Sequence, residues 1–206
     1  LFLICFFLPL GSVILHAQKQ NKDWAKIYKE QLFHITEVMV TDVASPPVAA
    51  RIYAYSNLAA YQAILQSGGS FKLGEIPSLQ PLAKQDPTSL GSPEFSAIYA
   101  MLLVGEKVMP SGYLLKEKQA DWVEWGLKNK LISKKDLGVH LAFAQTVADQ
   151  VWDLAKTDGY IQLSALNRYT PIEGEGFWYP TPPAYMAAVE PEWRTVRTFF
   201  LENLNE

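Results

Sequence analysis

Apolar side chains recur every three or four residues through much of the chain, the spacing typical of amphipathic helices. In residues 23–40 the apolar positions share one face, and charged positions lie largely between them. Prolines and glycines divide the rest of the pattern into separate segments. The pattern predicts helices over residues 23–40, 46–66, 93–108, 114–130 and 133–155, with a loop at 70–91.

The second predicted helix is unusual because nearly all of its residues are apolar or aromatic. Four positions in residues 48–65 are neither, namely Arg51, Ser56, Asn57 and Gln62. A helix that is apolar nearly all round belongs inside a bundle, so we expect neighbours to surround it. We expect Ser45 to cap its start, two prolines to occupy its first turn and glycines to end it.

Similar helix-start and helix-stop residues mark the ends of the other segments. Ser92 before a proline repeats this kind of helix start, and Ser133 with Asp136 resembles a capping box. Asp158-Gly159 is expected to end the fifth helix. From Tyr160 onward the chain is rich in proline, glycine and aromatic residues, and burying each ring stabilises by about 2 kcal/mol or more. We therefore expect an ordered loop packed over the bundle, and residues 194–205 could begin another helix.

Residues 1–17 are mostly apolar and contain no Asp, Glu, Lys or Arg, but Pro9 and Gly11 interrupt them, and a membrane span needs about 20 apolar residues. This is typical of the core of a secretory signal peptide, with cleavage expected after Ala17. An N-terminal membrane anchor that is never cut is the alternative. Because an initiator Met and a basic region are missing, we expect the sequence to begin inside an incomplete signal peptide. We therefore expect the protein to be secreted or periplasmic, with no stable membrane span after cleavage.

Composition excludes several classes of function. The net charge is −3 without any block of Lys or Arg, which argues against a nucleic-acid partner. The single cysteine, Cys5, excludes a disulfide scaffold and a multi-cysteine zinc site. The sequence also lacks a Gly-x-Ser-x-Gly nucleophile elbow and a glycine-rich phosphate loop in a strand–helix context.

Two sets of residues have the spacing of metal ligands on a helix. Glu30, His34 and Glu37 share one face, and Asp136 with His140 forms a second carboxylate–histidine pair. A di-iron bundle needs Glu-x-x-His on two helices and a glutamate from each of two others. Both spacings here are longer, so a solvated helix face is the favoured interpretation.

Arg51 stands on the nearly apolar second helix, where an unpaired buried charge would be costly. We favour a structural ion pair with an acid such as Glu37 or Asp42. Binding of an anion by Arg51 is the alternative.

Three stretches resemble secreted bacterial proteins related to vanadium-dependent haloperoxidases, in the type 2 phosphatidic acid phosphatase superfamily. They are residues 38–55 (VMVTDVASPPVAARIYAY), residues 158–160 (DGY), and residues 176–185 (GFWYPTPPAY) with 190–193 (EPEW). The resemblance covers most of residues 24–200. It implies an all-α fold, and it implies that this chain is half of a larger helical bundle.

The resemblance also implies an oxyanion pocket that holds vanadate or a substrate phosphate. The family builds it from Lys…Arg-Pro, Pro-Ser-Gly-His and a later Arg…His pair. The Pro-Ser-Gly at residues 110–112 is followed by Tyr113 in place of His, and it precedes the loop that should come first. We therefore assign no catalytic, cofactor-binding or metal-binding residue in this chain.

The sequence thus predicts three regions: the signal peptide at 1–17, a helical region at 18–160, and a proline- and aromatic-rich loop at 161–206 that leads to a catalytic half. In this interpretation the chain is the non-catalytic N-terminal portion of a haloperoxidase-like or acid-phosphatase-like protein. Vanadate is expected only in the full-length haloperoxidase. The expected partners are the protein's own C-terminal half and a homodimer. A stand-alone secreted binding or scaffold protein is the alternative.

Overall fold

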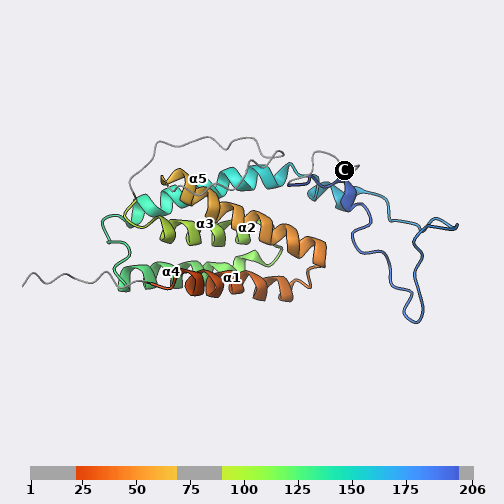
Figure 1. Cartoon of the computed structure of the whole chain (residues 1–206), viewed down its shortest axis with the longest axis horizontal. Coiled ribbons are helices and arrows are strands. Elements are labelled where there is room, and N and C mark those ends of the chain that lie inside the picture. The colour runs from red at the N-terminus through yellow and green to blue at the C-terminus, as the bar shows by residue number, and fades with distance from the viewer. Residues whose placement is uncertain (1–21, 69–89, 200–206) are drawn as a thin grey trace, which may run out of the picture.

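A computed structural model describes residues 22–68 and 90–199 of the chain. Within these ranges the chain forms five α-helices and no β-strand, and the helices pack into an elongated bundle (Figure 1). The all-α bundle predicted from the sequence is confirmed. The helices are α1 Trp24–Thr41, α2 Pro46–Gln66, α3 Pro93–Val108, α4 Leu115–Lys128 and α5 Leu137–Lys156.

Two predicted segments cannot be compared with this structure. The signal peptide at 1–17 lies outside the described residues, as does nearly all of the loop at 70–91. In the part of the chain that is described, no helix combines the length and apolar character needed to cross a membrane.

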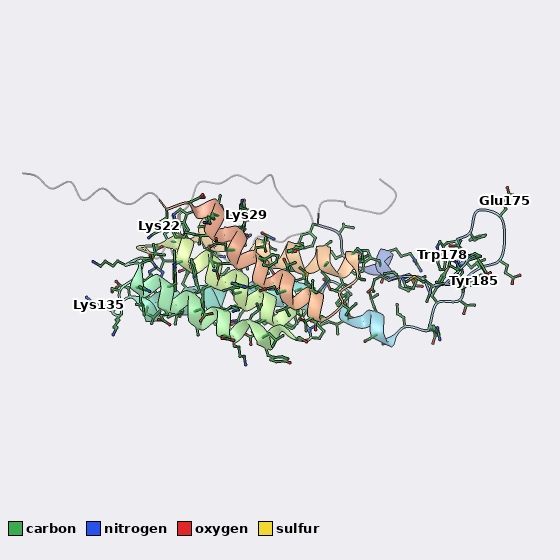
Figure 2. The ribbon with its side chains drawn as sticks, turned by 90° about the horizontal axis from the view of Figure 1, so that it is seen from below. Lys22, Lys29, Lys135, Glu175, Trp178 and Tyr185 are labelled. Carbon is green, nitrogen blue, oxygen red and sulfur yellow. The ribbon has the colours of Figure 1, made fainter. Side chains whose placement is uncertain are left out.

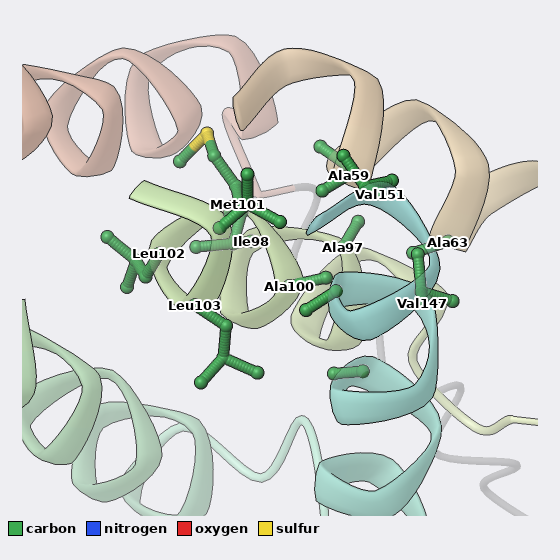
Figure 3. Close-up of a cluster of buried hydrophobic side chains, with 14 of the residues drawn as sticks. Ala59, Ala63, Ala97, Ile98, Ala100, Met101, Leu102, Leu103, Val147 and Val151 are labelled. Carbon is green, nitrogen blue, oxygen red and sulfur yellow. The ribbon is translucent and has the colours of Figure 1, made fainter. Parts of the chain in front are cut away.

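α3 lies at the centre of the bundle and contacts all four other α-helices. α2, α3 and α5 approach one another closely because many of the side chains between them are small (Figure 3). The side-chain ridges of one helix fit into the grooves of its neighbour. The contact includes Ala59 and Ala63 of α2, Ala97 and Ala100 of α3, and Val147 and Val151 of α5.

The central position of α3 corrects the expectation that neighbours surround the nearly apolar second helix. α2 packs mainly against α3 and α5. Its remaining face borders a cavity that is described below. Both helices are apolar enough for the centre, and the sequence pattern alone does not rank them.

The helix starts agree with the prolines but not with the predicted serine caps. Prolines occupy the first turns of α2 and α3, as predicted, but neither Ser45 nor Ser92 makes a side-chain cap hydrogen bond. The Ser45 hydroxyl instead donates to the Glu190 carboxylate at 3.1 Å. Asp23 caps α1 by accepting a hydrogen bond from the Lys26 backbone N–H at 3.0 Å.

The fourth and fifth helices begin later than predicted. A short 3₁₀ helix, Gly112–Leu114, precedes α4, and α4 ends at Lys128. The paired residues of the predicted capping box do meet, since the Asp136 N–H donates to Ser133 Oγ at 3.2 Å. The Ser133 hydroxyl donates to the Asp136 carboxylate at 2.6 Å. This pair closes a turn, and α5 starts only at Leu137.

Residues 166–190 do not pack over the bundle, so for them that prediction is wrong, whereas Tyr160 and residues 193–199 do contact the helices. We call residues 166–190 the arm. It extends beyond one end of the bundle, with Trp178 and Tyr185 far from the helices (Figure 2). Its large apolar side chains are about half exposed or more: Leu166, Ile172, Phe177, Trp178, Tyr179, Tyr185, Met186 and Val189.

Within the arm, the rings of Tyr169 and Trp178 contact one another, with centroids 6.3 Å apart. After the arm, a 3₁₀ helix spans Trp193–Thr195 and residues 196–199 are not helical. The predicted helix at 194–205 is therefore absent up to residue 199, and its remainder lies outside the described residues.

A buried aromatic stack joins α3 to α4. The ring of Trp122 lies 5.7 Å from that of Phe95 and 4.8 Å from that of Trp125, and its indole N–H donates to the Phe95 carbonyl at 3.0 Å. Gly126 lies directly against this stack, because a Cβ there would be 2.7 Å from Phe95 Cε2. The stack therefore requires glycine at this position.

Gly126→Ala is expected to lower the free energy of unfolding by about 1–3 kcal/mol, because the added methyl group forces a packed ring to move. The measurement is the urea midpoint. Gly138→Ala is the matched control, because nothing lies within 4 Å of the Cβ it would add. That control should leave stability unchanged or raise it by up to about 1 kcal/mol. Equal midpoints for the two variants would contradict the packing described here.

Candidate functional site

Arg51, the residue that stood out in the sequence, forms a buried ion pair with Asp158. Its Nε donates to Asp158 Oδ2 at 2.6 Å and its Nη2 donates to the Ala155 carbonyl at 3.0 Å. The side chains are 4% and 1% exposed, so water does not screen the pair. The predicted structural ion pair is confirmed, but the predicted acids are wrong.

Both predicted acids have other partners. Glu37 pairs with His34 on the same helix at 2.9 Å. The Asp42 carboxylate accepts a hydrogen bond from the Ser111 backbone N–H at 3.1 Å. Asp158 instead reaches Arg51 because α5 runs beside α2 and ends near it. The sequence separation of 107 residues hid this pairing from local pattern analysis.

The turn after α5 fixes the Asp158 side chain. Gly159 has a φ of +95°, and a Cβ there would lie 2.9 Å from the Thr195 carbonyl oxygen. This turn allows the Tyr160 N–H to donate to Asp158 Oδ1 at 2.9 Å. The second carboxylate oxygen is thereby satisfied as well, which a buried charge needs.

Two tyrosine rings cover the guanidinium of Arg51. Its Cζ lies 4.4 Å from the ring centroid of Tyr160 and 5.0 Å from that of Tyr55. A cation over an aromatic face is attracted by the electron density of the ring. Arg51 is therefore held by a carboxylate, a carbonyl and two rings, and this argues against the alternative that it binds an anion.

Arg197, which the sequence analysis did not single out, joins the same cluster. Its backbone N–H donates to the Asp158 carbonyl at 2.7 Å. Its Nη2 donates to the Leu154 carbonyl at 2.8 Å and to the Tyr55 hydroxyl at 3.1 Å. The cation therefore lies at the C-terminal end of α5, where the helix dipole favours positive charge. No local motif marks such a residue.

The environment of Tyr55 disfavours loss of its proton. Burial and the nearby negative charge of Asp158 raise the pKa of the Tyr55 hydroxyl to about 12, against an opposing effect of Arg197. At neutral pH the hydroxyl is therefore protonated and accepts the hydrogen bond from Arg197.

The ion pair borders a cavity of about 530 Å³ between α2 and residues 193–199. Its walls are mostly apolar, and Arg194 and Arg197 add positive charge. A second apolar cavity of about 280 Å³ lies toward α1 and shares Asn57 and Tyr61 with the first. The size and lining of the larger cavity are those of a pocket or groove that can hold a partner group.

The candidate metal ligands are not brought together. His34 pairs with Glu37, and Glu30 lies 3.9 Å from Lys26 on the helix surface. His140 is buried rather than solvated, hydrogen-bonded to Ser96 Oγ at 2.8 Å, and burial lowers its pKa. Over residues 22–68 and 90–199, no three His, Cys, Asp or Glu side chains are grouped as metal ligands.

The described residues do not form an oxyanion pocket either. Ser111 lies in a turn, and its backbone N–H donates to the Asp42 carboxylate. Gly112 packs against the Glu106 carbonyl. Arg51 is bonded to Asp158, His34 to Glu37 on its own helix, and His140 to Ser96 of α3. This arrangement does not fit vanadate or phosphate, because no imidazole joins the arginines.

Asp158→Asn is expected to cost about 3–5 kcal/mol in the free energy of unfolding, because it leaves the Arg51 charge buried without a counterion. Asp149→Asn is the matched control: Asp149 is 52% exposed and pairs with Lys107 at 3.3 Å. Such surface pairs contribute about 1 kcal/mol or less. Urea denaturation measures both. The double variant Arg51→Met with Asp158→Leu should lose less stability than Asp158→Asn alone. If Asp158→Asn lost no more stability than Asp149→Asn, the role of the buried pair would be contradicted.

The raised pKa of Tyr55 predicts a loss of stability at alkaline pH. In the unfolded chain the hydroxyl ionises near 10.0, and in the folded chain near 12, so the unfolded state loses its proton first as the pH rises. Stability present below pH 10 should fall between pH 10 and 12 by about 2–3 kcal/mol for this group. In urea titrations across this range, Tyr55→Phe should flatten the fall, whereas Tyr113→Phe, at a 62% exposed position, should not. Identical slopes would contradict the prediction.

Comparison with known proteins identifies one likeness. No model of a known protein family matches the sequence, and no curated protein matches it. A solved structure, described as the first bacterial vanadium-dependent iodoperoxidase, matches with a TM-score of 0.71 and 28% sequence identity. The match covers 87% of this chain but 43% of the other, so this chain spans less than half of the length of that relative. The chain therefore has a haloperoxidase-like, all-α fold.

Proposed function

We propose that this chain is the non-catalytic N-terminal portion of a secreted haloperoxidase-like protein. The complete protein would oxidise halide ions with hydrogen peroxide, and phosphomonoester hydrolysis is the second activity that such an oxyanion pocket suits. In this proposal the described helices supply packing surface, and the groups that bind the oxyanion belong to polypeptide that follows residue 206.

The extent of the structural match carries the proposal. Nearly all of this chain matches the iodoperoxidase structure, while more than half of that structure has no counterpart here, since the match covers 43% of it. Arg51 and Arg197 support the same division, because both are bonded to groups of the bundle itself.

Vanadate is proposed as the cofactor of the longer product, since the related solved structure is vanadium-dependent. The described residues of this chain do not fit that group, so none is proposed to hold it. Secretion is proposed on residues 1–17, which are mostly apolar and contain no Asp, Glu, Lys or Arg, and an exported product would then begin at Gln18.

The test compares the chain from Gln18 to Glu206 with the product of the natural reading frame. Both are assayed for triiodide formation from iodide and peroxide, with and without orthovanadate, and for hydrolysis of p-nitrophenyl phosphate. We expect no turnover by the chain of residues 18–206, because its described cations and histidines are held apart. We expect vanadate-dependent iodide oxidation by the longer product.

Phosphate hydrolysis without iodide oxidation would identify the phosphatase branch of the proposal. Turnover of either substrate by the chain of residues 18–206 alone would contradict the placement of the active site. A reading frame that stops after Glu206 would favour a stand-alone secreted binding or scaffold protein.

A further inference from the structure

The four methionines of the chain differ sharply in their exposure to water. Met39, Met101 and Met109 lie in or directly after helices α1 and α3, and each is at most 5% exposed. Met186 lies in the arm and is 69% exposed. The one cysteine, Cys5, is outside the described residues. In the described part of the chain, Met186 therefore carries the one sulfur atom that is largely exposed to water.

The local structure of the arm keeps this thioether accessible. The Tyr185 backbone N–H donates to the Thr181 carbonyl at 3.0 Å, which closes the turn that precedes Met186. Tyr185 lies beyond the end of the bundle (Figure 2). Met186 also lines a cavity of about 620 Å³ within the arm, together with Trp178. A water molecule occupies about 30 Å³, so the cavity readily admits hydrogen peroxide, which is little larger than water.

An exposed thioether reacts with peroxide to form a sulfoxide. The lone pair of the sulfur attacks one peroxide oxygen, so an S–O bond forms while the O–O bond breaks. The second oxygen leaves as water after it takes up the proton of the first. The sulfur loses two electrons and the peroxide gains them, so this step needs no further reactant.

We propose that Met186 is a site of reversible oxidation by hydrogen peroxide. The inference rests on the proposed function for the source of the oxidant, because halide oxidation consumes peroxide. The sulfoxide is polar and chiral, whereas the thioether is apolar. It shares its cavity with Trp178 and Val189, so oxidation makes this apolar part of the arm more polar.

The position of Met186 allows this change without loss of the fold. Met101 is fully buried in α3, the central helix, where a sulfoxide would place a polar oxygen among apolar side chains at a large cost. Met186 does not belong to the described core. Methionine sulfoxide reductases return the sulfoxide to the thioether. The arm can therefore be oxidised and restored while the bundle stays folded.

The test follows all four methionines in one sample. The purified protein is incubated with hydrogen peroxide, and the sulfoxide in each methionine-containing peptide is quantified over time by mass spectrometry. We expect Met186 to be oxidised at least about tenfold faster than each of the other three, because a buried thioether reacts only when the bundle opens. In urea-unfolded protein the four rates should be alike. Met186→Leu should remove the fast reaction and leave the three slow rates unchanged.

Two further measurements test reversibility and the tolerance of the fold. After the fast reaction, methionine sulfoxide reductases should restore Met186 in the folded protein, and the urea midpoint should equal that of untreated protein. A rate for Met186 no higher than that of Met39 would overturn the proposal, even in a protein that oxidises iodide. Failure of the reductases, or a lowered urea midpoint after the fast reaction, would also overturn it. Fast and reversible oxidation of Met186 in a protein without halide oxidation would support the site and count against the proposed function alone.

Discussion

The buried contact between Arg51 and Asp158 ties together parts of the chain that local forces cannot bring together. Arg51 lies in α2 and Asp158 follows α5, 107 residues later. Because both charges are shielded from water, the contact is favourable only when every remaining donor and acceptor is satisfied. Tyr160 and Arg197 meet this demand, and both are thereby fixed against the bundle. One interaction thus orders α2, the end of α5 and the segment that leads to Phe199.

Local rules explain which features of the fold were predictable from the sequence. Apolar periodicity and proline positions are properties of neighbouring residues, so they located α1, α2 and α3 to within one residue. The same rules failed where the outcome depends on distant groups. Ser45 bonds to Glu190 instead of capping its own helix, and the centre of the bundle is α3 rather than α2.

The candidate site was predictable only in part, for the same reason. A charged residue on an apolar helix implies a buried partner, so the sequence pattern identified Arg51 as part of a candidate site. The identity of the partner could not, because Asp158 reaches it only through the packing of α5 beside α2. Arg197 follows a proline-rich segment and lies in the stretch expected to begin a helix, which is not helical at residues 196–199, so its place at the end of α5 is visible only in three dimensions.

The arm leaves and re-enters the bundle at nearly the same point. The rings of Tyr160 and Trp193 meet edge to face, with centroids 5.9 Å apart, so the intervening residues form a loop closed at its base. Few of its side chains contribute to the core, and its ends are secured independently of its path. A proteolytic nick or a change of length within this loop is therefore expected to leave the bundle folded, with the two ends of the loop held by these contacts.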